Sequence, residues 1–142
     1  MRVLALDVGD KTIGVAISDE LCITARGLFT LERISNKKDT GKILEIIDDN
    51  DCKTVVIGLP INLDNSDSIQ TEKVRGFETA LKNKLMSTGH KDIDVVMHDE
   101  RFSTKIAEQV LIDADVSRKK RKEIIDTQAA IVILQSYLES LR

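Results

Sequence analysis

The segment that most constrains the fold is the apolar run at residues 2–8, RVLALDV. Its apolar residues stand at consecutive positions, which is typical of a central strand covered by helices on both faces. The next apolar run, residues 13–18, follows after a turn of four residues. A turn of that length is too short for a parallel crossover, so the two runs are predicted to pair as antiparallel strands.

The remainder of the chain alternates strand and helix patterns. Further strands are expected within residues 23–31, over 54–57 parallel to the first strand, and over 93–97. Helices are expected from a cap at Asp39 or Thr40 to about Asp49, along the apolar stripe Val74, Phe77, Leu81 and Leu85, after a cap at Ser103 or Thr104, and over about 122–141. This order predicts an α/β fold with a mixed sheet, in which an antiparallel meander is followed by parallel strands.

Length and composition restrict the class of protein. A chain of 142 residues with 42% hydrophobic content is expected to form one domain over residues 1–142. Apolar runs of strand length and the absence of a signal-peptide pattern predict no membrane span. Cys22 and Cys52 are interpreted as small buried residues of a protein in the reducing cytoplasm. A net charge of −3 argues against a uniformly basic nucleic-acid surface but allows local basic patches.

An aspartate interrupts the first strand. Asp7 follows four apolar residues, and burying an isolated charge costs on the order of several kcal/mol unless the charge is hydrogen-bonded, paired or bound to a metal. The carboxyl ends of parallel strands meet at one edge of a sheet, and Glu100 lies just past the fifth strand. Asp126 falls in line with Ala130 on the last helix, where small residues would allow that helix to approach the sheet. The three acids are therefore expected to converge.

Three acids held together repel one another unless a cation neutralises them. Oxygen ligands without nitrogen or sulfur favour Mg²⁺ or Mn²⁺, and two such ions about 3.5–4 Å apart would support phosphodiester hydrolysis. Each acid alone also has a simpler interpretation. Asp7 could shape a turn, Glu100 could be a helix-entry charge, and Asp126 could be a polar residue at the edge of the core.

Other residues are candidates for contact with phosphate. Gly9 and Gly14 would let a nucleic-acid backbone approach Asp7, although a hairpin turn and a strand bulge explain them equally well. Lys11 could contact phosphate or simply be solvated. A basic run, hereafter the basic run 118–122, opposes the dipole of the last helix and is expected to bind phosphate: Arg118, Lys119, Lys120, Arg121 and Lys122. His98 is interpreted as a packing residue at a strand end.

Four segments of the chain, taken in order, resemble one protein family. They are LALDVGDKTIGVAISD at 4–19, VIGLPINLD at 56–64, DERFST at 99–104 and SRKKRKEIIDTQAAIVILQSYL at 117–138. In these segments the chain is similar to the YqgF-type, or RuvX, family, whose members are described as pre-16S rRNA nucleases or Holliday junction resolvases. The resemblance implies an RNase H-like fold with strand order 3-2-1-4-5 and an acidic site at Asp7, Glu100 and Asp126. It also marks Gly9, Lys11, Gly14, Arg101 and Thr104 as motif positions that contact substrate or shape the site.

The resemblance implies a metal-dependent nuclease that processes the 5′ end of pre-16S rRNA or resolves DNA junctions. Symmetrical cutting of a junction needs a paired active site, and the sequence shows no dimer seam, so rRNA processing by a monomer or weak homodimer is favoured. Two alternatives come from other classes. The Asp-x-Gly hairpin also occurs in actin-like and sugar-kinase-like nucleotide binders, and the acids could be remnants in a non-catalytic nucleic-acid-binding assembly factor.

Overall fold

The computed structural model describes residues 1–60, 68–99 and 118–141, with the side chains of the last range described from Thr127 onward. Its elements, in chain order, are β1 (Arg2–Val8), β2 (Thr12–Ser18), β3 (Ala25–Glu32), α1 (Asn36–Asn50), β4 (Cys52–Leu59), α2 (Ile69–Ser87), β5 (Asp94–Asp99) and α4 (Arg118–Ser140). The helix predicted after Ser103 or Thr104 lies outside the described residues.

The five strands form one mixed sheet in the order β3-β2-β1-β4-β5. β2 is antiparallel to both β1 and β3, while β4 is parallel to β1 and to β5. The short turn after β1 forces the antiparallel pair, and the helices α1 and α2 provide the longer crossovers that parallel neighbours need. The predicted mixed sheet and its strand order are confirmed.

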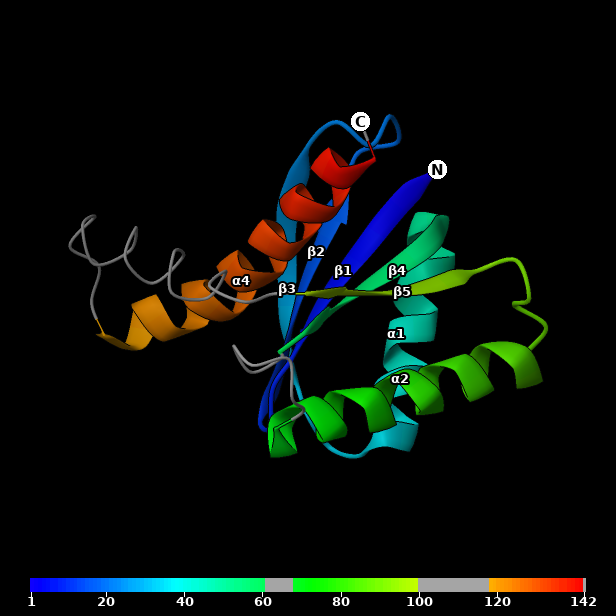
Figure 1. Cartoon of the computed structure of the whole chain (residues 1–142), viewed down its shortest axis with the longest axis horizontal. Coiled ribbons are helices and arrows are strands. Elements are labelled where there is room, and N and C mark those ends of the chain that lie inside the picture. Colours follow the sequence, from blue (N-terminus) through cyan, green and yellow to red (C-terminus); the bar gives the residue numbers. More distant parts are fainter. Residues whose placement is uncertain (61–67, 100–117, 142) are drawn as a thin grey trace.

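Helices cover both faces of the sheet (Figure 1), because both sets of alternating residues in the central strands are apolar. Leu4, Leu6 and Val8 of β1 belong to the core beneath α1 and α2. Val3 and Ala5 belong to a second core with α4 on the opposite face. The predicted stripe of α2 is fully part of the first core, since Val74, Phe77, Leu81 and Leu85 are all buried.

The first helix begins earlier than predicted. Ser35 is its N-cap and accepts a hydrogen bond from the Lys38 backbone, so Asp39 and Thr40 lie inside the helix. Asp39 is not a cap, because its carboxylate is buried and pairs with Arg33. The mistake has a physical cause: a Ser and an Asp four residues apart both resemble caps, and only a tertiary partner decides between them.

The last helix also begins earlier than expected. α4 starts at Arg118, so the backbone of the basic run 118–122 forms its first turns rather than preceding it. Among the described residues, no helix combines the length and the apolar character that crossing a bilayer requires.

The two cysteines differ in their environment. Cys52 is buried, and burial raises the pKa of its thiol to about 11. Cys22 is only half-buried and adopts a left-handed backbone with φ of 58°, while its Sγ donates to the Met1 carbonyl at 3.2 Å. The prediction of a buried residue is thus confirmed for Cys52 and wrong for Cys22, which lies in the turn between β2 and β3.

Candidate active site

Asp7 lies near the carboxyl end of the central strand, on the face that α4 covers. Strand alternation decides the face, because Val3 and Ala5 of the same strand pack in the α4 core. The Asp7 side chain is half-buried rather than fully enclosed. A carboxylate in this position is partly screened from water yet reachable from the edge of the sheet.

Both strand neighbours of Asp7 are glycines. Gly14 of β2 pairs with Asp7 directly, and extending the register from Leu6 and Ile57 by one residue places Gly58 of β4 on its other side. Both glycines are buried. The residue directly opposite Asp7 on each neighbouring strand therefore has no side chain. The β1–β2 register runs through Gly14 without a shift, whereas the β2–β3 register shifts between Val15 and Ala16. The missing side chain at Gly14 fits the predicted approach of a nucleic-acid backbone to Asp7, and the irregularity one residue further along β2 fits the alternative of a strand bulge, so the role of Gly14 stays a prediction.

The turn after β1, residues 8–12, presents Lys11 to solvent. The Gly9 backbone N–H donates to the Thr12 carbonyl at 2.8 Å and closes the turn. A Cβ on Gly9 would lie 3.1 Å from the Thr12 oxygen, so a side chain at this position would crowd the turn. The turn geometry is a sufficient reason for a glycine at position 9, and the further role of Gly9 in admitting a nucleic-acid backbone stays a prediction. The exposed Lys11 ammonium keeps its predicted access to phosphate.

Residues that sequence analysis missed support this turn from beneath. Arg33, which follows β3, donates to the Gly9 carbonyl at 3.1 Å and forms an ion pair with the buried Asp39 at 3.1 Å. Gln70 of α2 donates to the Val8 carbonyl at 3.1 Å. One signal was available: Asp39 stands one turn before Ile43 on the apolar stripe of α1, and an acid on such a stripe requires a partner.

The remaining predicted site residues lie in the segment 100–126. Glu100, Arg101 and Thr104 lie outside the described residues, as do the side chains of Asp126 and of the basic run 118–122. Position 100 directly follows the last residue of β5. Position 126 belongs to α4, one helical turn before Ala130, which is buried against the sheet. The convergence of the three acids therefore remains a prediction.

Two contacts fix α4 on the sheet. The hydroxyls of Thr127 and Thr30 are 3.0 Å apart, and a Cβ on Gly27 would lie only 2.2 Å from Cγ2 of Thr127. This close contact between helix and strand involves the residue that follows Asp126. On the same face but at the opposite edge of the sheet, His98 of β5 lies 2.8 Å from the Ser136 hydroxyl of α4 and packs edge-on against Tyr137. His98 is thus a packing residue, as predicted.

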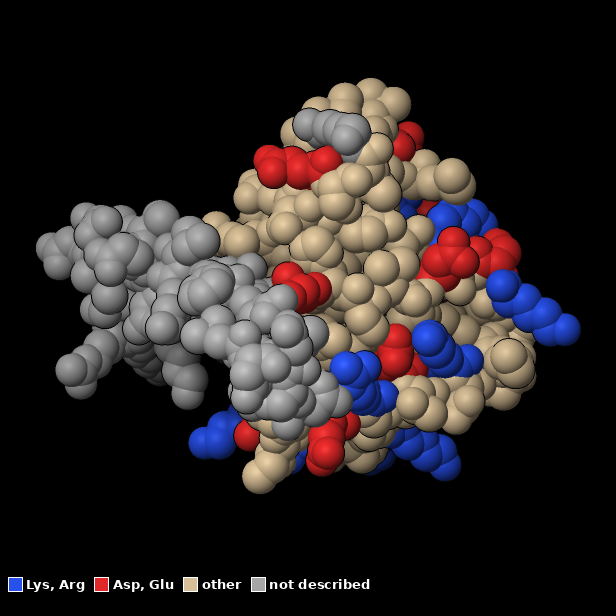
Figure 2. Space-filling view, in the orientation of Figure 1, with Lys and Arg blue, Asp and Glu red and all other residues tan. Residues whose placement is uncertain are grey.

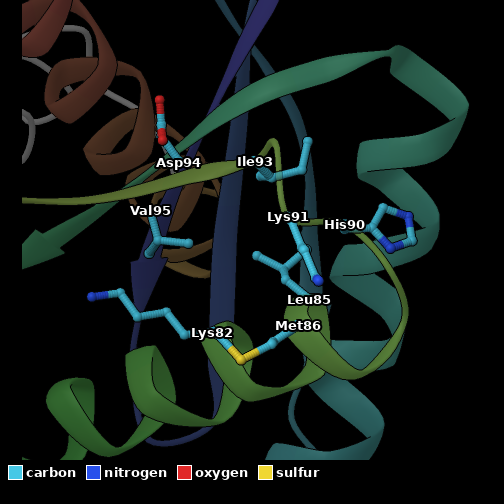
Figure 3. Close-up of a pocket in the computed structure, with 8 residues that line it drawn as sticks. All are labelled: Lys82, Leu85, Met86, His90, Lys91, Ile93, Asp94 and Val95. Atoms are coloured by element: carbon cyan, nitrogen blue, oxygen red, sulfur yellow. The ribbon is translucent and has the colours of Figure 1, made fainter.

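A pocket of about 370 Å³ lies elsewhere, between the end of α2 and the start of β5 (Figure 3). Leu85, Ile93 and Val95 line it, and Asp94 points away from Val95 on the other side of the strand. Asp7, the predicted acid that the structure describes, does not line this pocket. In the part of the chain that the structure describes, no three His, Cys, Asp or Glu side chains come together as a metal site would require; the predicted triad has only Asp7 in that part.

Charges are mixed on the described part of the face in Figure 2, where lysines and arginines alternate with acids. Opposite charges also pair directly among the described residues, as in Lys73–Asp10 at 3.1 Å and Lys53–Asp92 at 3.0 Å. The Lys53 ammonium hydrogen-bonds the Asp92 carboxylate and lowers its pKa. This pattern agrees with the prediction that the chain carries no uniformly basic coat.

Solved structures with the same fold are junction-resolving enzymes. The chain is similar to Thermus thermophilus RuvC in complex with a Holliday junction substrate, with a TM-score of 0.57 and 15% identity over 99% of this chain and 96% of that chain. It is also similar to the fowlpox virus resolvase in complex with Holliday junction DNA, with a TM-score of 0.59 and 15% identity over 99% of both chains. At this identity the likeness shows the fold alone, which is the predicted RNase H-like fold.

Sequence relatives are much closer. A Staphylococcus epidermidis protein named "Putative pre-16S rRNA nuclease" is 47% identical over 99% of this chain and 97% of its own length. A Desulforamulus reducens protein of the same name is 46% identical over 99% of this chain and 98% of its own length. The family described as RuvX, Holliday junction resolvase, matches residues 1–140. The chain belongs to the RuvX family.

Proposed function

We propose that this protein is a metal-dependent nuclease that hydrolyses phosphodiester bonds of structured nucleic acid. The observation that carries the proposal is the position of Asp7. Its half-buried carboxylate lies near the carboxyl end of β1, between Gly14 and Gly58 and on the face covered by α4. Family membership supports the same reading, because the relatives are named as nucleases.

The ligand set would be Asp7, Glu100 and Asp126, which offers only carboxylate oxygens. Such a set suits Mg²⁺ or Mn²⁺, and Asp7 fits the role because it lies near the carboxyl end of β1 with a glycine opposite it on each neighbouring strand. When bound, a pair of these ions supplies charge neutralisation, a lower pKa for the attacking water and stabilisation of the leaving oxygen.

The other residues would hold the nucleic acid. Lys11 is exposed on the turn beside Asp7 and is suited to a phosphate contact. Gly9 and Gly14 keep the approach to that turn free of side chains. Arg101, Thr104 and the basic run 118–122 complete the proposed substrate contacts, and the run lies at the start of the helix that carries Asp126.

The favoured substrate is the 5′ end of pre-16S rRNA, which would be processed in the cytoplasm by a monomer or weak homodimer. The names of the sequence relatives support RNA. The family description and the junction-bound structural neighbours support a second candidate, the four-way DNA junction. Resolving a junction symmetrically would require two copies of the site, so the oligomeric state bears directly on this choice.

The deciding experiment compares both substrates side by side with Mg²⁺ and with Mn²⁺. Asp7→Asn is expected to lower kcat by about a hundredfold to a thousandfold, as the loss of an electrostatic group from an active site does. Glu100→Gln and Asp126→Asn should behave alike. Asp94→Asn is the matched control, because Asp94 is an exposed acid of β5 beside the distant pocket and should leave cleavage unchanged.

Cleavage of neither substrate under any of these conditions would instead support a non-catalytic binding factor. The basic run 118–122 has its own test, since each lost phosphate contact lowers the salt dependence of binding by about one unit of slope. Replacing the run with glutamines should weaken binding and flatten that slope. An unchanged slope would remove the run from the interface.

A further inference from the structure

The turn that follows Asp7 is held by side chains from two other parts of the chain. Arg33 donates to the Gly9 carbonyl at 3.1 Å, and its backbone N–H donates to the Lys11 carbonyl at 2.9 Å. Gln70 donates to the Val8 carbonyl at 3.1 Å. These contacts reach the residues immediately after Asp7 from the face opposite its carboxylate.

Arg33 is itself held in a single orientation. Its Nε donates to the buried Asp39 carboxylate at 3.1 Å, and its Nη2 donates to the Asn36 side chain. The guanidinium carbon lies 5.4 Å from the centre of the Phe77 ring, a cation–π distance. All three nitrogens of the planar guanidinium thus donate in fixed directions, to Asp39, Gly9 and Asn36. A lysine ammonium cannot make this set of bonds.

Stability alone gives little reason for this arrangement. Gly9 and Thr12 already close the turn by their own hydrogen bond, and the β1–β2 ladder continues up to Val8 and Ile13. Asp39 is 2% exposed and Arg33 16% exposed, and a buried ion pair is often no more stabilising than apolar residues of similar size. What the pair does provide is a fixed position for the Gly9 carbonyl, two residues beyond Asp7.

We propose that Arg33 is a positioning residue that sets the placement of Asp7 through the turn that follows it. The proposal rests on the proposed nuclease function of Asp7. A misplacement of about 1 Å in a catalytic constellation can lower the rate about a hundredfold. Loss of the Arg33 bond to Gly9 would act in this way, without removing any group that touches substrate.

The first test is Arg33→Lys, which keeps the charge beside Asp39 but cannot also reach Gly9. The expected result is a kcat lowered by about tenfold to a hundredfold, with KM for nucleic acid within about twofold and a higher Mn²⁺ concentration for half-maximal activity. The matched control is Arg26→Gln, because Arg26 is exposed at the far end of the same strand, β3, from the turn. A folded Arg33→Lys variant with wild-type kcat and Mn²⁺ dependence would overturn the proposal.

A second variant guards against simple unfolding. Arg33→Met combined with Asp39→Asn removes both charges, so no uncompensated buried charge remains, and the asparagine oxygen can still accept from the Ile34 N–H as Asp39 does at 3.1 Å. This double variant should melt close to the wild type and show the same loss of kcat. Wild-type cleavage by the double variant would overturn the proposal.

A measurement that needs no cleavage separates the positioning role of Arg33 from the nuclease function. It is the paramagnetic broadening, by Mn²⁺, of the NMR signals of the Val8, Gly9 and Lys11 amides. If the wild type cuts no nucleic acid but Mn²⁺ broadens these signals less in the double variant, the positioning role stands and the nuclease function fails. If both proteins cleave nucleic acid equally well and Mn²⁺ broadens these signals equally in both, the positioning role fails and the nuclease function stands.

Discussion

The two faces of the sheet are built from alternate residues of the same strands, yet they differ in kind. Beneath α1 and α2 the central strands present large side chains such as Leu6, Ile13 and Ile57, all fully buried. Toward α4 they present Ala5 and Ala16, with the glycines and Asp7 further along the same rows. One face is filled for stability, whereas the other leaves space for a close helix and for polar groups.

This difference explains why the acids are predicted on the α4 face. Large side chains beside Asp7 would bury its carboxylate and make its charge costly. Small residues instead let the α4 backbone approach, as the contact of Thr127 with Gly27 shows. The filled face can then supply the stability that a polar site on the other face does not.

The largest expected effect is on the filled face. Leu6→Ala should lower the free energy of unfolding by about 2–5 kcal/mol, because the side chain is fully buried and leaves a cavity. Urea unfolding measures this, and cleavage per folded molecule should stay close to the wild type. A loss below about 1 kcal/mol, within the range of ordinary surface changes, would contradict the view that this face supplies the stability.

The second effect concerns the buried thiol of the filled face. Burial raises the pKa of Cys52 to about 11, from an ordinary value near 9. Between pH 9 and 11 the thiol of Cys52 therefore stays protonated in the folded protein but loses its proton in the unfolded chain. The stability that comes from burying the neutral thiol is complete below pH 9 and is lost as the pH rises toward 11. The loss is about 2–3 kcal/mol.

Denaturant unfolding between pH 8 and 11 tests this effect. Cys52→Ala should flatten the alkaline decline, whereas Cys22→Ala should keep it, since that change leaves Cys52 in place. Equal declines in the wild type and in Cys52→Ala would show that other groups cause the alkaline loss.

The third effect tests how closely α4 approaches the sheet. Gly27→Ala would place a Cβ 2.2 Å from Cγ2 of Thr127, and relieving such an overlap costs about 1–3 kcal/mol. Gly76→Ala is the matched control, because nothing lies within 4 Å of a Cβ there and alanine should stabilise α2 by about 0.5–1 kcal/mol. Thermal unfolding of both variants gives the comparison. Equal midpoints would mean that the contact is not tight.

Much of this two-faced fold could be predicted from the sequence. The hairpin followed from the length of its turn, and the stripe of α2 followed from its period. The start of α1 was missed because Asp39 pairs with Arg33, whose own position is fixed by the Gly9 carbonyl 24 residues earlier in the chain. A bond over that separation leaves no local pattern. Local capping rules described Asp39 correctly as a polar residue near a helix start but could not supply its partner.

The candidate site was predictable only in part for a related reason. Asp7 was recognised because a charge interrupts an apolar strand. Gly14 was also recognised as a neighbour of Asp7, but Gly58 was not, because its position beside Asp7 depends on the register between β1 and β4. Register between β1 and β4 is set by the packing of α1 across a long connection, and no short turn specifies it.

The smallest effect sharpens the polar character of the α4 face. The hydroxyls of Thr30 and Thr127 are 3.0 Å apart in a half-buried contact. Thr30→Val keeps the shape and the strand preference of the side chain but removes one hydroxyl, which leaves the other without this partner and should cost about 1 kcal/mol. Thr79→Val is the control, because the Thr79 hydroxyl is exposed and bonds only within α2, so its loss should stay within about 0.5 kcal/mol. If Thr30→Val is as stable as the control by chemical denaturation, α4 is held on this face by packing alone, and the small residues rather than the polar ones define the difference between the two faces.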